Sequence, residues 1–176
     1  MSDLDRSLLI EKILWEWDAL SESEFETISK GLPRKIVRWL AMSHPDNRSR
    51  KTLLRLSGVS IGCDAVINHG IVIEDNYESR VEIGARASIA CGVQLLAISS
   101  PNNSVLTESK SGEKMIKSSH VIVGQDAWIG AGAILLPGVE IGNRAVVASG
   151  AVVTRSCKSD VVVSGVPARE MKEIYF

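Results

Sequence analysis

Side chains that could exchange a proton near neutral pH are scarce in this chain. Histidine is the residue best suited to that role, and it occurs at His44, His69 and His120. A zinc site needs several such ligands gathered at one place. The three histidines are far apart in the sequence and His44 lies in a region of helical pattern, so we expect no bound metal.

A second candidate for chemistry is the polar stretch LLAISSPNNSV, Leu95–Val105. Ser99 and Ser100 are followed by Asn102, Asn103 and another serine, which all offer hydrogen bonds. A serine hydroxyl is far too weak a base to remove a proton alone. Pro, Asn and Ser also form loops, so the stretch is either a rebuilt site or a plain connection.

The composition indicates a globular protein with no strong pull towards nucleic acid. The chain has 176 residues, 45% hydrophobic and 23% charged, with a formal net charge of −1. No apolar run is long enough to span a bilayer, and we do not expect the stretch MSDLDRSLLIEK to act as a secretion signal, because it is acidic early and has no small-residue cleavage site. Cys63, Cys91 and Cys157 are scattered, which is typical of reduced thiols. We therefore expect a cytoplasmic protein.

Residues 1 to 56 are predicted to form a small helical region. Leu9, Ile13 and Trp17 recur at helical spacing, Ser21 and Glu24 match a capping box, and Pro33 suits the first turn of a third helix. A short basic and apolar stretch, RKTLLRL, then leads into a different pattern.

From residue 57 the pattern has a period of six. Twelve repeats can be counted, and a fixed short period of this kind indicates a solenoid. The apolar residue at the start of each repeat should point to the axis. These residues are Ile61, Ile67, Ile73, Ile83, Ile89, Leu95, Val123, Ile129, Leu135, Ile141, Val147 and Val153.

Three repeats should make one triangular coil of 18 residues, with small residues allowing the turns at its corners. Four coils are predicted within residues 57–176. Two insertions interrupt them, one of about four residues near Ser79 and a loop from about Ser99 to His120. Trp128 stands where neighbouring repeats carry Ala or Val. It could form a wall for a ligand or pack between subunits.

Three stretches resemble the hexapeptide-repeat acyltransferases, in particular the maltose and galactoside O-acetyltransferases and the capsule and colanic-acid acetyltransferases. They are GVSIG, DAWIGAGAILLPGVEIG and VVSGVPAREMK, and the likeness runs from about Gly58 to Lys172. The resemblance implies an all-β, left-handed parallel β-helix, against the usual right-handed crossover, followed by a C-terminal tail helix. It also implies a homotrimer with sites between subunits.

The resemblance further implies direct transfer of an acyl group, without an acyl-enzyme, from acetyl-CoA or another acyl-CoA. The acceptor would be a hydroxyl or amino group of a saccharide. Small residues would let the backbone approach the pantetheine arm and thioester, and cations would suit the nucleotide phosphates. The positions carried over for CoA are Ala90, Ala131 and Ser149, then Thr154, Arg155, Arg169 and Lys172, with Trp128 as a possible wall. A solvated basic edge is the alternative for the cations.

For the acceptor, Asn68 matches the family position that holds the sugar, and Asp75 and Asn76 match a polar family pair. Polar groups that bind hydroxyls are what saccharide recognition requires. A turn is the alternative for Asp75 and Asn76, since both residue types also favour turns.

The family histidine is replaced by Ser100. Either His69 or His120 acts as base instead, with Asn103 helping near the thioester, or the acceptor is an amine that needs less help. The third possibility is a catalytically impaired protein that binds CoA or saccharide. A carbonic anhydrase is disfavoured because it needs three histidines at one zinc. A nucleotidyltransferase is disfavoured because no glycine-rich phosphate loop precedes the repeats.

Overall fold

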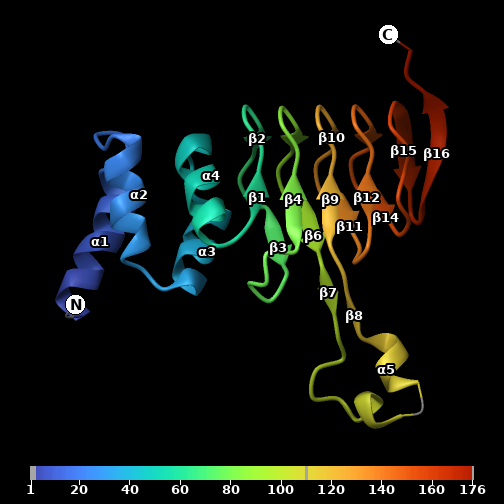
Figure 1. The fold of residues 1–176 in the computed structure, drawn as a ribbon, viewed down its shortest axis with the longest axis horizontal. Coiled ribbons are helices and arrows are strands. Elements are labelled where there is room, and N and C mark those ends of the chain that lie inside the picture. Colours follow the sequence, from blue (N-terminus) through green and yellow to red (C-terminus); the bar gives the residue numbers. More distant parts are fainter. Residues whose placement is uncertain (1–2, 110, 176) are drawn as a thin grey trace.

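The computed structural model describes residues 3–109 and 111–175. Helices lie at one end, a row of short strands follows, and an arm projects from the side (Figure 1). The helices are α1 (Asp3–Trp15), α2 (Glu22–Lys30), α3 (Arg34–Ser43) and α4 (Asn47–Leu56). None of the helices in the described ranges combines the length and the apolar character needed to cross a bilayer.

The helices predicted near the N-terminus are present, with one more than expected. Ser21 caps α2 and forms the full capping box with Glu24. The stretch RKTLLRL is the greater part of α4, which starts after Asp46, whose side chain accepts a hydrogen bond from the backbone N–H of Ser49. An aspartate cap of this kind satisfies a helix N–H that otherwise has no partner.

The six-residue repeat forms three parallel sheets around one core, as a β-helix. The first sheet has the order β1-β4-β9-β12, the second runs β15-β13-β10-β5-β2, with β16 beside β15, and the third runs β14-β11-β6-β3. The strand bounds are β1 (Ser60–Ile61), β2 (Val66–Ile67), β3 (Val72–Glu74), β4 (Val81–Ile83), β5 (Ser88–Ile89), β6 (Gln94–Leu96), β9 (Val121–Val123), β10 (Trp128–Ile129), β11 (Ile134–Leu135), β12 (Glu140–Ile141), β13 (Val146–Val147), β14 (Val152–Val153), β15 (Val161–Gly165) and β16 (Ala168–Glu173).

The register confirms the predicted coil length and both insertions. Ile122 pairs with Glu140, a step of 18 residues. Ser60 pairs with Glu82, a step of 22, which is one coil plus the four extra residues near Ser79. Val81 pairs with Val121, a step of 40, which is one coil plus the long insertion.

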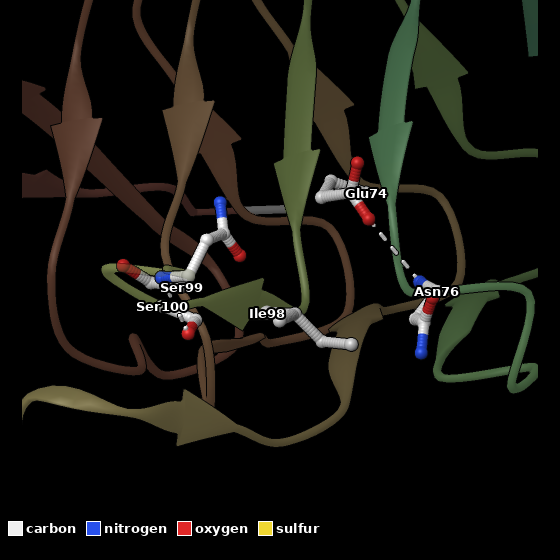
Figure 2. Close-up of a pocket in the computed structure, with 6 residues that line it drawn as sticks. Glu74, Asn76, Ile98, Ser99 and Ser100 are labelled. Atoms are coloured by element: carbon white, nitrogen blue, oxygen red, sulfur yellow. Dashed lines mark hydrogen bonds between the residues drawn. The ribbon is translucent and has the colours of Figure 1, made fainter. Parts of the chain in front are cut away.

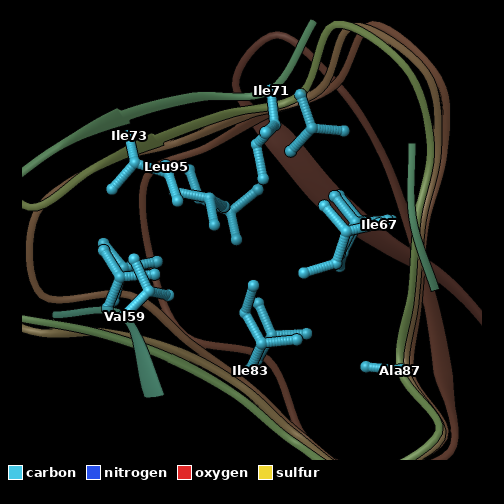
Figure 3. Packing of buried hydrophobic residues seen from close by; sticks show 14 of the residues in the cluster. Val59, Ile67, Ile71, Ile73, Ile83, Ala87 and Leu95 are labelled. Carbon is cyan, nitrogen blue, oxygen red and sulfur yellow. The ribbon is translucent and has the colours of Figure 1, made fainter. Parts of the chain in front are cut away.

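The core consists of stacked apolar side chains inside the triangle. Ile67, Ile89, Ile129 and Val147 follow one another in the second sheet, and all four are fully buried. Figure 3 shows such residues lying over one another within the three-sided ribbon. Successive coils are so close that a Cβ added at Gly84 would lie 2.6 Å from the backbone nitrogen of Gln125.

One corner of the triangle differs from the small-residue corners that were expected. Between the first and second sheets the turn residues are charged, and Arg86 and Asp126 adopt the left-handed conformation with φ of 55° and 58°. The Arg86 guanidinium donates to both carboxylate oxygens of Asp126, and Arg144 does the same to Asp160. These hydrogen bonds lower the pKa of both aspartates. We call this row, which begins at Asp64, the charged corner.

The predicted C-terminal tail helix is wrong. Residues Ala168–Glu173 form β16, which pairs antiparallel with β15. Their sequence, AREMKE, consists of residues that favour helices. However, β15 is the last strand of its sheet, and an edge strand leaves a row of backbone groups without partners. Pairing with that edge outweighs the weak local preference.

The N-terminal helices satisfy the edge at the opposite end. The backbone N–H of Ile67 donates to the side-chain oxygen of Asn47 at 2.9 Å, and its carbonyl accepts from Arg50 Nε at 2.7 Å. The N–H of Gly70 donates to the carbonyl of Met42 at 2.7 Å. The helical region therefore completes the hydrogen bonding of the first coil.

The long insertion forms the arm seen in Figure 1. It begins with β7 (Ile98–Ser99), which pairs antiparallel with β8 (Lys117–Ser118). The 3-10 helix η1 (Val105–Glu108) and the short helix α5 (Gly112–Met115) lie between them. Exposed apolar side chains on the arm include Val105, Leu106, Met115 and Ile116.

The edge capping by Arg50 can be tested against its neighbour on α4. Arg50 is 3% exposed and donates to the carbonyls of Ile67 and His44, whereas the Arg48 side chain is 43% exposed. We expect Arg50→Met to lower the free energy of unfolding by about 1–3 kcal/mol, because buried carbonyls lose their donors. Arg48→Met should cost about 1 kcal/mol or less. Urea denaturation measures both, and equal losses would contradict the capping role.

His44 has a structural role that predicts a pH dependence. It is 1% exposed, its Nε2 lies 3.1 Å from the carbonyl of Ile13, and its Nδ1 accepts from the N–H of Asp46 at 3.2 Å. This pattern needs the neutral ring with its proton on Nε2. Burial lowers the pKa of His44 below its ordinary value.

As the pH falls, His44 is therefore protonated at a higher pH in the unfolded chain than in the folded chain. The stability contributed by neutral His44 is present above about pH 6.5 and declines as the pH falls towards the lowered folded pKa. The slope can reach about 1.4 kcal/mol per pH unit for one proton. We expect His44→Gln to remove this component of the pH profile of unfolding. The exposed His69, changed to Gln, is the control and should keep it.

Candidate functional site

The candidate acceptor site is a cavity of about 550 Å³ where the arm leaves the β-helix. We call it the arm-base cavity. In Figure 2 Glu74 and Asn76 lie on one side, Ser99 and Ser100 on the other, and Ile98 between them. Its lining consists of Glu74, Asn76, Ile98, Ser99, Ser100 and Asn102. The sequence analysis had matched two of these, Asn76 and Ser100, to family site positions, and it had singled out Ser99 and Asn102 within the polar stretch.

Glu74 enters the cavity because it ends β3. Side chains alternate along a strand, and since Ile73 is buried in the core, Glu74 is exposed on the outside. Its Oε1 accepts from the backbone N–H of Asn76 at 3.2 Å. Asn76 has a φ of 51°, the left-handed region that asparagine tolerates. The tight turn after β3 thus places both side chains at the cavity.

Asp75 points the opposite way, into the protein. It is 1% exposed, and its Oδ1 lies 3.1 Å from Nη1 of Arg38 on α3, which is 3% exposed. The same oxygen accepts from the backbone N–H of Tyr77 at 2.9 Å, and the Tyr77 ring lies under the Arg38 guanidinium. The prediction that Asp75 contacts the acceptor is corrected: its carboxylate fixes the turn that presents Glu74 and Asn76.

The serine side of the cavity is organised by a small turn. The backbone N–H of Asn102 donates to Ser100 Oγ at 3.1 Å, with Asn102 at a φ of 49°. Asn103, the predicted helper at the thioester, is exposed and does not line the cavity. The structure brings its neighbour Asn102 there instead.

Neither candidate histidine lines the arm-base cavity. His69 is exposed in the turn after β2, at the opposite end of β3 from Glu74, and Asn68 lies beside it, donating from its side chain to the carbonyl of Ile89 at 3.1 Å. Nδ1 of His120 lies 3.4 Å from Glu82 of the first sheet. Within one copy of the chain, Asn68 and His69 are therefore separated from Ser100 by the length of one side.

Three of the predicted CoA positions share one corner, between the second and third sheets. Ala131 and Ser149 occupy equivalent turns in successive coils, and the carbonyl of Ala131 accepts from the N–H of Gly150 at 2.8 Å. Ala90 follows β5 at the same corner. Trp128 lies on β10 of the adjoining sheet and is 56% exposed.

The predicted cations partly converge at the C-terminal end. Arg155 and Arg169 line a cavity of about 210 Å³ together with Lys158, which the sequence analysis missed. We call it the basic cavity, and three cations around one hollow are suited to phosphate. Thr154 is exposed immediately before Arg155, while Lys172 is exposed on β16 opposite Val162.

Cys157 also lines the basic cavity, but it is not prepared as a nucleophile. Burial raises the pKa of its thiol, and the thiolate rather than the thiol is the reactive form. Among the described residues no group of His, Cys, Asp and Glu is placed to hold a metal ion.

Comparisons with known proteins agree with the repeat. A family model described as bacterial transferase hexapeptide (six repeats) matches residues 120–155. Galactoside O-acetyltransferase from Escherichia coli (strain K12) is 35% identical over 118 residues, 67% of this chain and 55% of that protein. A putative acetyltransferase from Dictyostelium discoideum is 42% identical over 116 residues, covering 66% of this chain and 58% of that protein. The chain belongs to the hexapeptide-repeat acetyltransferase family.

Solved structures of this acetyltransferase family share the fold. A galactoside acetyltransferase in complex with coenzyme A has a TM-score of 0.59 at 25% identity, covering 83% of this chain and 81% of that one. A hexapeptide-repeat acetyltransferase from Vibrio cholerae, complexed with acetyl coenzyme A, has a TM-score of 0.65 at 21% identity, covering 96% and 99%. The chain spans little more than half the length of the curated relatives described above.

The sequence analysis missed Glu74, although the sequence carried a signal for it. The residue after the first apolar position is Gly62, Gly84, Gly124 or Gly142 in the first sheet's repeats, and Leu96, Leu136 or Thr154 in the third sheet's. Glu74 is the charged exception to that series. A charge at a position that is otherwise small, apolar or neutral could have directed attention to it.

The structural role of Asp75 is testable. We expect Asp75→Asn to lower the free energy of unfolding by about 3–5 kcal/mol, because it breaks a buried ion pair and leaves Arg38 uncompensated. Asn76→Gly removes a cavity side chain at a position whose left-handed φ suits glycine, so it should stay within about 0.5 kcal/mol of the original. Chemical denaturation of both variants checks this, and an unchanged stability for Asp75→Asn would contradict the structural role of its ion pair.

Proposed function

We propose that this protein transfers an acetyl group from acetyl-CoA to a sugar-type acceptor. The observation that carries the proposal is the convergence of Arg155, Lys158 and Arg169 on one cavity at the end of a hexapeptide β-helix. Similarity to galactoside O-acetyltransferase over the same repeats supports it. Another acyl-CoA could serve as the donor in place of acetyl-CoA, and the thiol-release assay described below can be run with either.

In this proposal the phosphates of CoA bind at the basic cavity, with Thr154 and Lys172 nearby. The pantetheine arm follows the corner that holds Ala90, Ala131 and Ser149. Small side chains there let backbone N–H groups approach the ligand, and Trp128 forms a wall beside it. One of those N–H groups would stabilise the oxyanion as the acceptor attacks the thioester carbonyl.

A complete site requires more than one copy of the chain. The arm-base cavity and the corner of Ala131 and Ser149 lie at opposite ends of the third sheet's side, so one copy does not place acceptor and thioester together. We propose that each chain forms a left-handed β-helix, as the family resemblance implies, and that three copies form a homotrimer. In this trimer the arm-base cavity of one copy faces the corner of Ala131 and Ser149 of its neighbour. The exposed Trp128 and the apolar residues of the arm provide surface for that contact, and a closed ring satisfies it.

The transfer is direct in this scheme. The acceptor attacks the thioester carbon, the C–S bond breaks, and CoA leaves as its thiolate, so that no enzyme group is acylated. Asn68 and Asn76 would hydrogen-bond the saccharide hydroxyls. The protonated thiol of Cys157 has no part in the chemistry, in keeping with its raised pKa.

A second candidate is a protein that binds CoA or saccharide without turnover. The observation in its favour is the composition of the arm-base cavity, where Ser99 and Ser100 occur and none of the described histidines does. Release of free thiol from acetyl-CoA in the presence of sugar acceptors separates the two, because only an enzyme produces it.

Calorimetric titration with CoA tests the nucleotide end of the site. Arg155→Ala and Arg169→Ala should each weaken CoA binding by about 1–3 kcal/mol, since each removes a charge-assisted hydrogen bond to phosphate. Lys30→Ala, on α2 at the other end of the molecule, is the matched control and should leave the affinity unchanged. If both arginine variants bind like the original, the basic cavity is not the phosphate site.

A further inference from the structure

We propose that the carboxylate of Glu74 takes the acceptor's proton and that the acceptor group is a primary amine. This inference rests on the proposed acetyl transfer and deepens it by naming the proton acceptor and the class of acceptor. It follows from what the arm-base cavity contains. Of the six described residues that line it, Glu74 alone has an acidic or basic side chain.

Glu74 is available for this role because the fold does not use its charge. The side chain is exposed, and within the described residues its carboxylate forms no ion pair, accepting instead from the backbone N–H of Asn76. Its partner in the next coil is Leu96. A carboxylate beside an apolar neighbour does nothing for the packing of the coils, so its place at the cavity calls for another explanation.

The position of Glu74 is also held firmly. The next residue, Asp75, is buried and ion-paired with Arg38, and its carboxylate accepts from the N–H of Tyr77. The turn that follows Glu74 is therefore anchored to α3. In Figure 2 Glu74 faces the same hollow as Ser99 and Ser100 from the other side. A catalytic group must be held in a fixed geometry to be effective.

The candidate histidine bases do not line the arm-base cavity of the same copy. His69 lies at the far end of β3, and His120 lies against Glu82 of the first sheet. Ser99 and Ser100 are too weakly basic to act alone. Glu74 is thus the base that a single copy of the chain places in its own arm-base cavity.

A carboxylate base suits an amine better than a hydroxyl. A hydroxyl must lose its proton as it attacks, which calls for a base near the working pH such as imidazole. A neutral amine attacks with its lone pair and becomes acidic only once the C–N bond has formed, so that a weaker base is sufficient. The carboxylate would also attract the amine in its cationic form.

The step balances as follows. The ammonium form of the acceptor first loses one proton to solvent, and the free amine then bonds to the thioester carbon. The C–S bond breaks and CoA leaves as thiolate. Glu74 takes one of the two N–H protons of the bonded nitrogen and returns it to the thiolate, which leaves an amide with one N–H, the free thiol of CoA and the original carboxylate.

The experiment compares amino sugars with their neutral parents. Hexosamines that carry the amine at carbon 2, 3 or 4, and the corresponding hexoses, are offered to the full-length protein with acetyl-CoA. We expect an amino sugar to be acetylated at least about 10-fold faster than its parent. Glu74→Gln should reduce kcat by about 10²-fold or more, the lower end for general-base catalysis, with CoA affinity unchanged. The exposed Glu140 of β12, changed to Gln, is the control and should keep full activity.

Preferential transfer to hydroxyls, or an unchanged kcat in Glu74→Gln with an amino sugar, overturns the proposal. A wild-type protein that fails to bind CoA refutes the proposed function instead. If CoA binds without turnover, the affinity of the CoA complex for hexosamine decides the inference. The inference is supported if the CoA complex binds the hexosamine more tightly than the hexose, and if this preference is lost in Glu74→Gln but kept in Glu140→Gln. Equal affinity for the two sugars overturns it.

Discussion

Every coil of this protein depends on backbone hydrogen bonds to the coil before and the coil after it. Parallel pairing with an 18-residue step keeps the inward residue of each side over its equivalent in the next coil. Such a stack has two open ends, and each would expose a row of unpaired groups. At one end the β15–β16 hairpin covers the edge, and at the other the side chains of Asn47 and Arg50 do so.

The same requirement couples the helices to the candidate site. Arg38 reaches from α3 to the carbonyl of Ile73 and to the carboxylate of Asp75. It therefore serves both the edge of β3 and the turn that carries Glu74 and Asn76 to the arm-base cavity. The helical region, which lies outside the family likeness from Gly58 to Lys172, has a direct influence on the geometry of the acceptor side.

Much of the β-helix could be predicted because a six-residue period is a strong, repeated signal. The lengths of both insertions followed from where the period breaks, and the register agrees with them. The tail helix was predicted wrongly because only the three-dimensional structure reveals the open edge of β15, with which AREMKE pairs despite its helical preferences. Asp75 was placed in the site because adjacent residues of similar polarity cannot be told apart by sequence when one faces the core.

The site was less predictable than the fold for a physical reason. Coil stacking depends on residue type at a fixed spacing, whereas a cavity depends on which of two exposed neighbours faces it, as with Asn102 rather than Asn103. Family likeness directed attention to a missing histidine at Ser100. The sequence marks Glu74 as a charged exception in its series, but only the placement of the turn and the arm shows that it faces the same cavity as Ser100.

The charged corner has a consequence for how a protein of this kind can lengthen. Its signs alternate from coil to coil, as Asp64, Arg86, Asp126, Arg144 and Asp160, and neighbouring members are joined by ion pairs at Arg86–Asp126 and Arg144–Asp160. Duplicating one coil in a gene would set two like charges side by side, which is unfavourable. Duplicating two coils together preserves the alternation. One coil is 18 residues long, the step from Ile122 to Glu140, so two coils are 36 residues. Gain or loss of 36 residues at a time therefore keeps the charged corner intact, whereas gain or loss of one coil does not.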